Sequence, residues 1–360
     1  MNGLASFRDG KTAQQLAAHL RSLRLENVRL MEVCGTHTVS IARAGIRQLM
    51  PEGITLTSGP GCPVCVTATA DIDRCIGAAR LPGVIVATFG DLLRVPGSSS
   101  TLRAEMTAGA DVRVVYSPLD AVAMARENPD RQVIFLGVGF ETTTPTVAGA
   151  ILQAEAERIR NFSVLSSHKV MPPALTALVD DPQVAVSGLI CPGHVSIVIG
   201  ADAYLPLAER YRIPCVITGF EPVDILQGIV MLARQIEQGE ARVEIAYQRA
   251  VTRQGNARAR EVMAQVFQTV DARWRGLGEI ADSGLAINDR YADFDTDRRF
   301  AITVEPTREP AGCRCGAVLK GIISPEVCKL FGSACTPERP VGPCMVSSEG
   351  ACAARYRYQD

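Results

Sequence analysis

Short apolar runs alternate with amphipathic segments through the first 240 residues of the chain. The runs are rich in β-branched residues and predict strands at Val28–Val33, Gly53–Thr57, Val84–Thr88, Val112–Tyr116, Gln132–Val138, Phe162–Leu165, Val184–Ile190 and Cys215–Thr218. Segments with helical periodicity fall between or after them, at Ala121–Glu127, Thr146–Arg160 and Val223–Gln238. Apolar strands that alternate with amphipathic helices predict parallel sheets with helices on both faces.

The predicted strands also suggest how the chain divides into domains. They fall into two consecutive sets of four, separated by the turn sequence Asn128-Pro129-Asp130. After Asp271, Gly, Pro, Cys and Arg become more frequent and the strand pattern fades. We therefore expect a Rossmann-like α/β domain at residues 1–128, a second at 129–270, and a small irregular domain organised around cysteines at 271–360.

Composition excludes several classes of function. Lys plus Arg number 37 and Asp plus Glu 38 in 360 residues, and this balance argues against a protein that coats nucleic acid or an anionic membrane. No apolar run approaches the roughly 20 residues that span a bilayer, and the first thirty residues lack the apolar core of a signal peptide. We predict a cytoplasmic protein that binds neither nucleic acid nor a membrane.

Twelve cysteines are the unusual feature of the composition. Cytosolic thiols are kept reduced, so metal binding or redox chemistry is expected of them. Six lie close to the C-terminus, and Cys315 and Cys344 are the additional thiols among them. Four thiolates from one irregular segment rich in Gly and Pro can hold a 4Fe–4S cluster, whereas the paired CxxC knuckles of a zinc ribbon are absent. The predicted ligands are Cys313, Cys328, Cys335 and Cys352, and structural zinc is the alternative.

The sequence Gly59–Cys65, GPGCPVC, forms a second candidate site. It follows a predicted strand and precedes a helical run. A CxxC at a helix N-terminus has one thiol exposed to the positive end of the helix dipole, which lowers its pKa and favours thiol–disulfide exchange. We interpret Cys62 and Cys65 as a redox dithiol, with half of a zinc site as the alternative.

A third candidate site, Cys34–Thr38, also follows a strand directly. Ligands collect at the carboxyl ends of parallel strands, so Cys34 is expected in a crevice with His37 about one helical turn away. A thiolate and an imidazole can bind a transition metal or form a nucleophilic pair, and a packed cysteine beside a capping histidine is the alternative. Other polar groups that follow strands are Asp91, Glu141, His168, His194 and Glu221.

Taken together, these motifs resemble the HypD family of NiFe-hydrogenase maturation proteins, and the resemblance covers nearly the whole chain. It is carried by CGTHT at Cys34–Thr38, GPGCPVC at Gly59–Cys65, ATFGD at Ala87–Asp91, GFETTTP at Gly139–Pro145, CPGHVS at Cys191–Ser196, GFEP at Gly219–Pro222 and GPCMVSSEGAC at Gly342–Cys352. The resemblance implies two α/β domains and a small iron–sulfur domain.

The resemblance also implies a function. HypD-like proteins act with a small HypC-like chaperone to hold iron while two cyanides and one carbon monoxide are added to it. Cyanide comes from a HypE-like donor that is charged by HypF, and the finished Fe(CN)2CO unit passes to the hydrogenase large subunit. On this chain Cys34 would bind that iron, with His37 and Asp91 beside it.

The remaining thiols acquire roles by the same resemblance. Cys62 and Cys65 would be the redox dithiol, and Glu349 would support a ligand. The 4Fe–4S ligands would be Cys313, Cys328, Cys335 and Cys352. We expect an assembly scaffold that supplies electrons. An iron–sulfur thiol–disulfide reductase that acts on a protein disulfide is the alternative, and a zinc-stabilised binding module is a third possibility.

Overall fold

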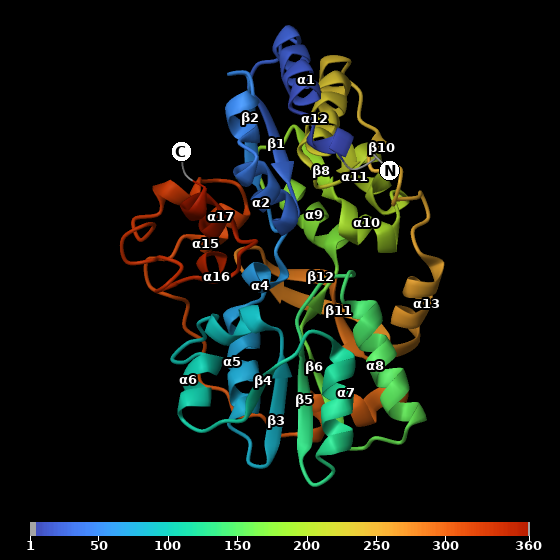
Figure 1. Cartoon of the computed structure of the whole chain (residues 1–360), viewed down its shortest axis with the longest axis vertical. Coiled ribbons are helices and arrows are strands. Elements are labelled where there is room, and N and C mark those ends of the chain that lie inside the picture. Colours follow the sequence, from blue (N-terminus) through green and yellow to red (C-terminus); the bar gives the residue numbers. More distant parts are fainter. Residues whose placement is uncertain (1–4, 359–360) are drawn as a thin grey trace.

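Two separate parallel sheets organise the computed structural model, which describes residues 5–358 (Figure 1). The five-stranded sheet has the order β10-β9-β8-β1-β2. Its strands are β1 (Val28–Glu32), β2 (Ile54–Ser58), β8 (Gly188–Pro192), β9 (Cys215–Thr218) and β10 (Val243–Ile245). Every neighbouring pair in this sheet is parallel, as the alternation of apolar strands and helices predicts.

The four-stranded sheet is also parallel and has the order β4-β3-β5-β6. Its strands are β3 (Val84–Thr88), β4 (Val112–Val114), β5 (Gln132–Gly137) and β6 (Phe162–Ser166). All five residues of β3 are buried, and so is β5 apart from its first residue. Continuous burial of this kind explains why these strands are apolar at every position instead of alternating.

The predicted grouping of the strands is wrong, because the sheets do not follow the order of the chain. Strands β1 and β2 pair with β8 and its neighbours, so the chain leaves the five-stranded sheet after β2 and returns to it at β8. The core explains this pairing, since Leu30 of β1 packs in one cluster with Ile190 and Val216. A boundary at residue 128 does not coincide with the division between the sheets. The turn at Asn128 only joins α7 to β5.

A third, antiparallel sheet has the order β11-β12-β7 and lies between the two parallel sheets (Figure 1). Its strands are β7 (His168–Lys169), β11 (Phe267–Trp274) and β12 (Gly278–Ile287). The expectation that strands fade after Asp271 is therefore wrong for this hairpin. Half of the residues of β11 are exposed and polar, and only its two ends are buried, so its sequence lacks the continuous apolar run of the other strands. Phe267 packs with the four-stranded sheet and Trp274 with the five-stranded sheet.

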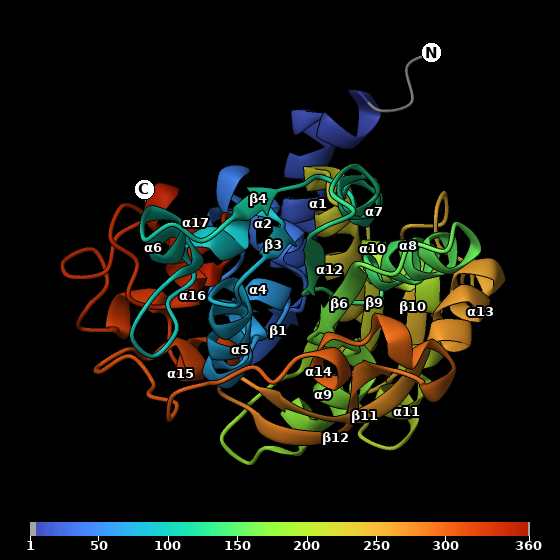
Figure 2. The same ribbon diagram turned by 90° about the horizontal axis from the view of Figure 1, so that it is seen from below.

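Helices cover the sheets on both faces, as Figure 2 shows for the four-stranded sheet, with α5 and α6 on one side and α7 and α8 on the other. The longer helices are α1 (Gly10–Ser22), α2 (Gly35–Arg43), α5 (Thr69–Ala79), α7 (Pro118–Glu127), α8 (Thr144–Ala156), α9 (Met171–Asp180), α12 (Pro222–Glu237) and α13 (Ala257–Val266). Within residues 5–358, no helix has both the length and the apolar character that crossing a bilayer requires.

The remaining helices are short. They are η1 (Ala5–Arg8), α3 (Ile46–Leu49), α4 (Pro63–Val66), η2 (Gly90–Arg94), α6 (Leu102–Thr107), α10 (Gly193–Ile199), η3 (Asp202–Tyr204), α11 (Leu205–Glu209), η4 (Asp289–Phe294), α14 (Thr296–Arg299), α15 (Cys315–Leu319), η5 (Pro325–Val327), α16 (Pro343–Val346) and α17 (Ala351–Arg357). The last four belong to a C-terminal segment that packs against α2 and the β1–β2 side of the five-stranded sheet (Figure 1).

Candidate metal and thiol site

Cys34 lies just beyond the carboxyl end of β1 and is the N-cap residue of α2. Its side chain is buried, with a relative exposure of 7%. Burial raises the pKa of the Cys34 thiol to about 12, although the backbone N–H of His37 opposes the shift. Cys34 is therefore a protonated thiol at neutral pH, and a metal that binds to it must displace that proton.

The GPGCPVC loop follows β2, the neighbouring strand, and packs directly against Cys34. The N–H of Gly35 donates to the carbonyl oxygen of Gly61 over 3.0 Å. A Cβ atom at Gly61 would lie 2.2 Å from the backbone nitrogen of Cys34, so only glycine allows the two loops to approach this closely. The structure thus brings Cys34 and the CxxC sequence to one edge of the five-stranded sheet.

The CxxC cysteines are both buried, with Cys62 at the N-terminus of α4 as expected, and the resolved pKa shift at Cys65 is upward and not downward. Cys62 caps α4, and its sulfur accepts a hydrogen bond of 3.4 Å from the N–H of Cys65. Burial raises the pKa of Cys65 well above its ordinary value. The helix that carries Cys65 has only four residues and packs into a core with Trp274, and this desolvation outweighs the effect of so short a helix dipole.

His37 is fully buried, and its ring is bonded to β9. Its Nε2 lies 2.9 Å from the carbonyl oxygen of Gly219 and 2.8 Å from Oγ1 of Thr218. Burial lowers the pKa of His37 to about 4, so the ring is neutral. Because Nε2–H donates to a carbonyl, Nδ1 carries the lone pair, and it has no hydrogen-bond partner among residues 5–358.

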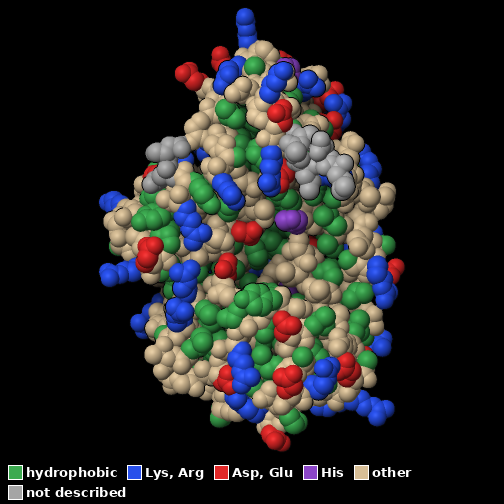
Figure 3. Space-filling view, in the orientation of Figure 1, with side chains coloured by type: hydrophobic (Ala, Val, Ile, Leu, Met, Phe, Trp, Pro, Cys, Tyr) green, Lys and Arg blue, Asp and Glu red, His purple; other side chains and the backbone are tan. Residues whose placement is uncertain are grey.

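Two further residues of the predicted site form hydrogen bonds that involve the C-terminal segment. Glu349 belongs to that segment, and Asp91 follows β3. The Thr36 hydroxyl donates to Glu349 Oε1 over 2.7 Å, and the Ser347 hydroxyl donates to Asp91 Oδ2 over 3.0 Å. The segment 347–349 therefore connects the Cys34 loop with the end of β3. Figure 3 shows a hollow at the centre of the molecule where acidic, hydrophobic and histidine side chains meet.

An aromatic stack borders this region. The rings of His194 and Phe220 lie 3.9 Å apart, and those of Phe220 and His37 lie 4.7 Å apart. His194 is exposed, and partial burial of its imidazole lowers the pKa while the charge of Glu349 opposes the shift. The motifs that follow β8 and β9 thus converge on the loops that follow β1 and β2.

The C-terminal cysteines gather around one cavity. It is lined by Cys313, Cys315, Cys328, Cys335, Cys344 and Cys352, together with apolar side chains. The structure therefore brings the four predicted cluster ligands together. It also places beside them the two C-terminal thiols that received no role from the sequence.

Cys344 connects this cavity to the CxxC sequence. Its thiol neighbours the thiols of Cys65, Cys315 and Cys352, which affect its pKa. Cys315 is in turn within reach of Cys313. A continuous series of thiols thus runs from the CxxC pair into the cysteine cavity. Sequence reasoning missed this role for Cys344, although Gly342-Pro343, a helix-start signal, places it at the beginning of α16.

The cavity suits an iron–sulfur cluster by three observations. Leu330, Phe331 and Met345 line it with apolar surface, and the N–H of Val341 donates to the Cys335 sulfur over 3.3 Å. A Cβ atom at residue 342 would lie 2.6 Å from the Cys313 sulfur, and glycine leaves that space open. Within residues 5–358, no three Cys, His, Asp or Glu side chains are placed to hold a single metal ion.

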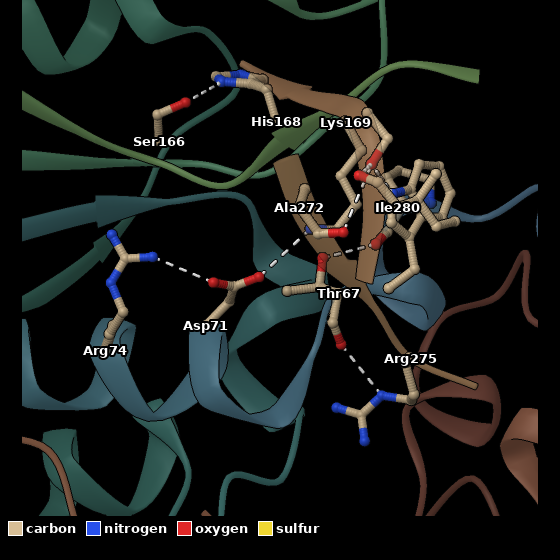
Figure 4. Close-up of polar contacts among 12 residues, drawn as sticks. Thr67, Asp71, Arg74, Ser166, His168, Lys169, Ala272, Arg275 and Ile280 are labelled. Atoms are coloured by element: carbon tan, nitrogen blue, oxygen red, sulfur yellow. Dashed lines mark hydrogen bonds and ion pairs between the residues drawn. The ribbon is translucent and has the colours of Figure 1, made fainter. Parts of the chain in front are cut away.

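A buried arginine, missed in the sequence, joins the CxxC loop to the cysteine segment (Figure 4). Nε of Arg275 donates to the carbonyl oxygen of Thr67 over 3.1 Å, and Nη1 donates to the Thr69 hydroxyl over 2.7 Å. The same Nη1 donates to Glu309, four residues before Cys313, over 2.9 Å. Arg275 lies in the turn between β11 and β12. Because the sequence pattern did not predict this hairpin, it gave no sign that Arg275 would be buried.

A second buried cation lies where the four-stranded sheet meets the hairpin (Figure 4). Lys169 is 3% exposed, and its Nζ lies 3.4 Å from Oδ2 of Asp71. Asp71 is also paired with Arg74 over 3.1 Å, and the Lys169 ammonium lies 5.9 Å from the centre of the Trp274 ring. His168 and Lys169 follow β6, and this ion pair fixes their loop against α5.

Comparisons with known proteins match one family over nearly the whole length of the chain. The family model described as HypD, Hydrogenase formation hypA family, matches residues 11–359. The chain is 47% identical to the "Hydrogenase maturation factor HypD" of Azotobacter vinelandii, covering 99% of this chain and 97% of the relative. It is 44% identical to the protein of the same name from Escherichia coli (strain K12), covering 96% of this chain and 93% of the relative.

Proposed function

Because the chain belongs to the HypD family of hydrogenase maturation factors, we propose that it is the scaffold on which the Fe(CN)2CO unit is assembled and that it supplies electrons for that assembly. The observation that carries the proposal is the series of thiols Cys62, Cys65, Cys344 and Cys315, which runs from the Cys34 loop to the cysteine cavity. Soft thiolate ligands suit low-spin iron with such diatomic ligands.

In this proposal Cys34 is the iron ligand. Its proton leaves when the thiolate binds the metal, because the free thiol is protonated at neutral pH. Thr36 and Glu349 fix the loop through their hydrogen bond, and His37 anchors α2 to β9. A HypC-like chaperone would contribute a second ligand to this iron.

The electrons would come from the thiols and the group in the cavity. Oxidation of the Cys62–Cys65 pair to a disulfide releases two electrons and two protons. A 4Fe–4S cluster held by Cys313, Cys328, Cys335 and Cys352 would supply single electrons. Cyanide would arrive from a HypE-like donor charged by HypF, and the product would pass to the hydrogenase large subunit.

The alternative, a reductase that acts on a protein disulfide, is less well supported. Cys62 and Cys65 are 4% and 0% exposed, so a disulfide on another protein does not reach them in this conformation. A thiol pair enclosed in this way is better suited to exchange electrons with the neighbouring Cys344 than with an external substrate.

Replacement of Cys34 tests the proposal. The Cys34→Ala variant, purified anaerobically with its HypC-like partner, should keep its fold and its brown absorbance but lose the infrared bands of cyanide and carbon monoxide. Cys75→Ala is the matched control, because Cys75 is also buried but lies on α5 in a separate core, and this variant should keep the bands. Bands that persist in Cys34→Ala would contradict the assignment of Cys34.

A further inference from the structure

A cavity of about 400 Å³ lies between the five-stranded sheet and the C-terminal segment, away from the cysteines. One wall is the face of β1 and β2 that carries Arg29, Thr55 and Thr57. The opposite wall is formed by residues 321–326 and α17, and the ends of α2 and α3 complete it. A Cβ atom at Gly321 would lie 2.6 Å from the terminal methyl of Met31, so glycine allows this wall to approach β1 closely.

The charges that face this cavity are unbalanced. Arg29, Arg47 and Arg355 line it together with a single carboxylate, Glu326. Arg355 is paired with Glu326. Arg29 and Arg47 form no ion pair with any carboxylate in the part of the chain that the structure describes. Two guanidinium groups therefore face one cavity without an ion pair of their own, although the more distant carboxylates of Glu32 and Glu326 act on Arg47.

Arg47 is desolvated by burial, yet most of its N–H donors have no hydrogen-bond partner. It occupies α3, and its one hydrogen bond, from Nη2 to the Ser58 hydroxyl, is long at 3.4 Å. Burial lowers the pKa of Arg47, the nearby charge of Glu32 opposes this shift, and the charge of Arg355 adds to it. A guanidinium has five donors in a planar fork that matches carboxylate and phosphate groups, and most of these donors are unused here.

We propose that this cavity binds a small-molecule oxyanion, a ligand with a phosphate or carboxylate group held by Arg47 and Arg29. The volume lies within the range of small-molecule sites and is too small for a macromolecule. Thr55 lines the same cavity, and its hydroxyl offers a further donor. The bound anion would supply the negative charge that the arginines lack.

The cavity is connected to the Cys34 loop through two side chains. Thr38 lines the cavity, and its hydroxyl donates to Glu32 Oε1 over 2.6 Å. The other oxygen of Glu32 accepts the N–H of Cys34 over 3.2 Å. A ligand in this cavity would therefore contact an element that also positions Cys34, although the proposed iron ligand itself is not part of the cavity.

Thermal unfolding of the full chain tests the proposal, with inorganic phosphate and with succinate as separate probes and sodium chloride at matched ionic strength as reference. At least one probe should raise the Tm of the wild type by about 2 °C or more at saturation. Arg47→Gln should abolish the shift. Arg258→Gln is the matched control and should retain it, because the Arg258 side chain on α13 is 80% exposed and far from the cavity.

The outcomes separate clearly. A shift from phosphate alone or from succinate alone identifies the class of anion and supports the site. No shift with either probe, or an equal shift in Arg47→Gln and Arg258→Gln, would overturn the proposal. Where Arg47→Gln does not fold, loss of binding in Arg29→Gln by titration calorimetry decides the question. Brown absorbance recorded in each sample separates this result from any failure of the cluster.

Discussion

The two parallel sheets are built alike, yet different kinds of side chain follow their strands. Thiols follow the strands of the five-stranded sheet, at Cys34, Cys62 and Cys65, together with His194 and Glu221. The strands of the four-stranded sheet are followed by Asp91, Glu141, His168 and Lys169, and by no thiol. The loops of the first set pack against one another at one edge of the sheet, whereas members of the second set bond to other segments of the chain.

Glu141 illustrates the second set. Its carboxylate is buried and accepts the N–H of Met171, the first residue of α9, over 2.8 Å. Helix α9 packs in the core of the five-stranded sheet, so a residue that follows one sheet holds a helix of the other. A strand end is therefore a good place for a functional group, but position alone does not distinguish chemistry from structural support.

The largest expected effect is on the thiol side of the comparison. Cys62→Ser should reduce hydrogenase maturation by more than about 100-fold, because one thiol cannot form the disulfide that releases two electrons. Brown absorbance and thermal stability should stay close to those of the wild type. Cys215→Ala, a buried cysteine of the same sheet outside the thiol series, should remain active. Loss of the absorbance in Cys62→Ser would instead place Cys62 at the cluster.

The next largest effect is expected on the structural side. Asp71→Asn should lower the free energy of unfolding by about 4 kcal/mol, because it leaves the buried Lys169 ammonium without a counter-charge. Lys169→Met should cost much less, since Asp71 keeps its pair with Arg74. Urea unfolding of the two variants measures the difference. Equal losses of unfolding free energy in the two variants would contradict the view that the buried Lys169 ammonium requires the Asp71 carboxylate.

A smaller effect concerns Glu141 and pH. Burial raises the pKa of Glu141 to about 7 in the folded protein, above its ordinary value of 4.5. The folded state thus binds more protons between these values, and the contribution of Glu141 to stability falls as pH rises through this window. The stability of the wild type relative to Glu141→Gln should fall by about 2 kcal/mol from pH 5 to pH 8. A constant difference across this range would contradict the shift.

Local patterns predict most elements of the parallel sheets. Seven of the eight predicted strands match the observed strands to within two residues at each end, and the helix predicted at Val223–Gln238 is observed one residue earlier, at Pro222–Glu237. What the pattern does not contain is the identity of each strand's neighbour. An apolar run such as Val28–Val33 is compatible with any buried parallel position, so its pairing with β8 depends on packing between distant segments.

The candidate site divides in the same way. Strand-end placement foresees that Cys34 and the CxxC cysteines lie together, because β1 and β2 are neighbours in one sheet. It does not foresee that both CxxC thiols are buried, which follows from packing by Trp274 and by the C-terminal segment. Nor could it identify Cys344 or Arg275, since the role of each depends on contacts with residues more than two hundred positions away.

The return of the chain to the five-stranded sheet at β8 also constrains the order in which the protein can form during its synthesis. Residues 84–166 contain the whole four-stranded sheet and can pair as soon as they leave the ribosome. Strands β1 and β2 must wait for β8 and β9 before their sheet is complete. Until then the thiols of Cys34, Cys62 and Cys65 lie open to oxidants and stray metals. We therefore expect these thiols to need a reducing environment most during synthesis, before the five-stranded sheet encloses them.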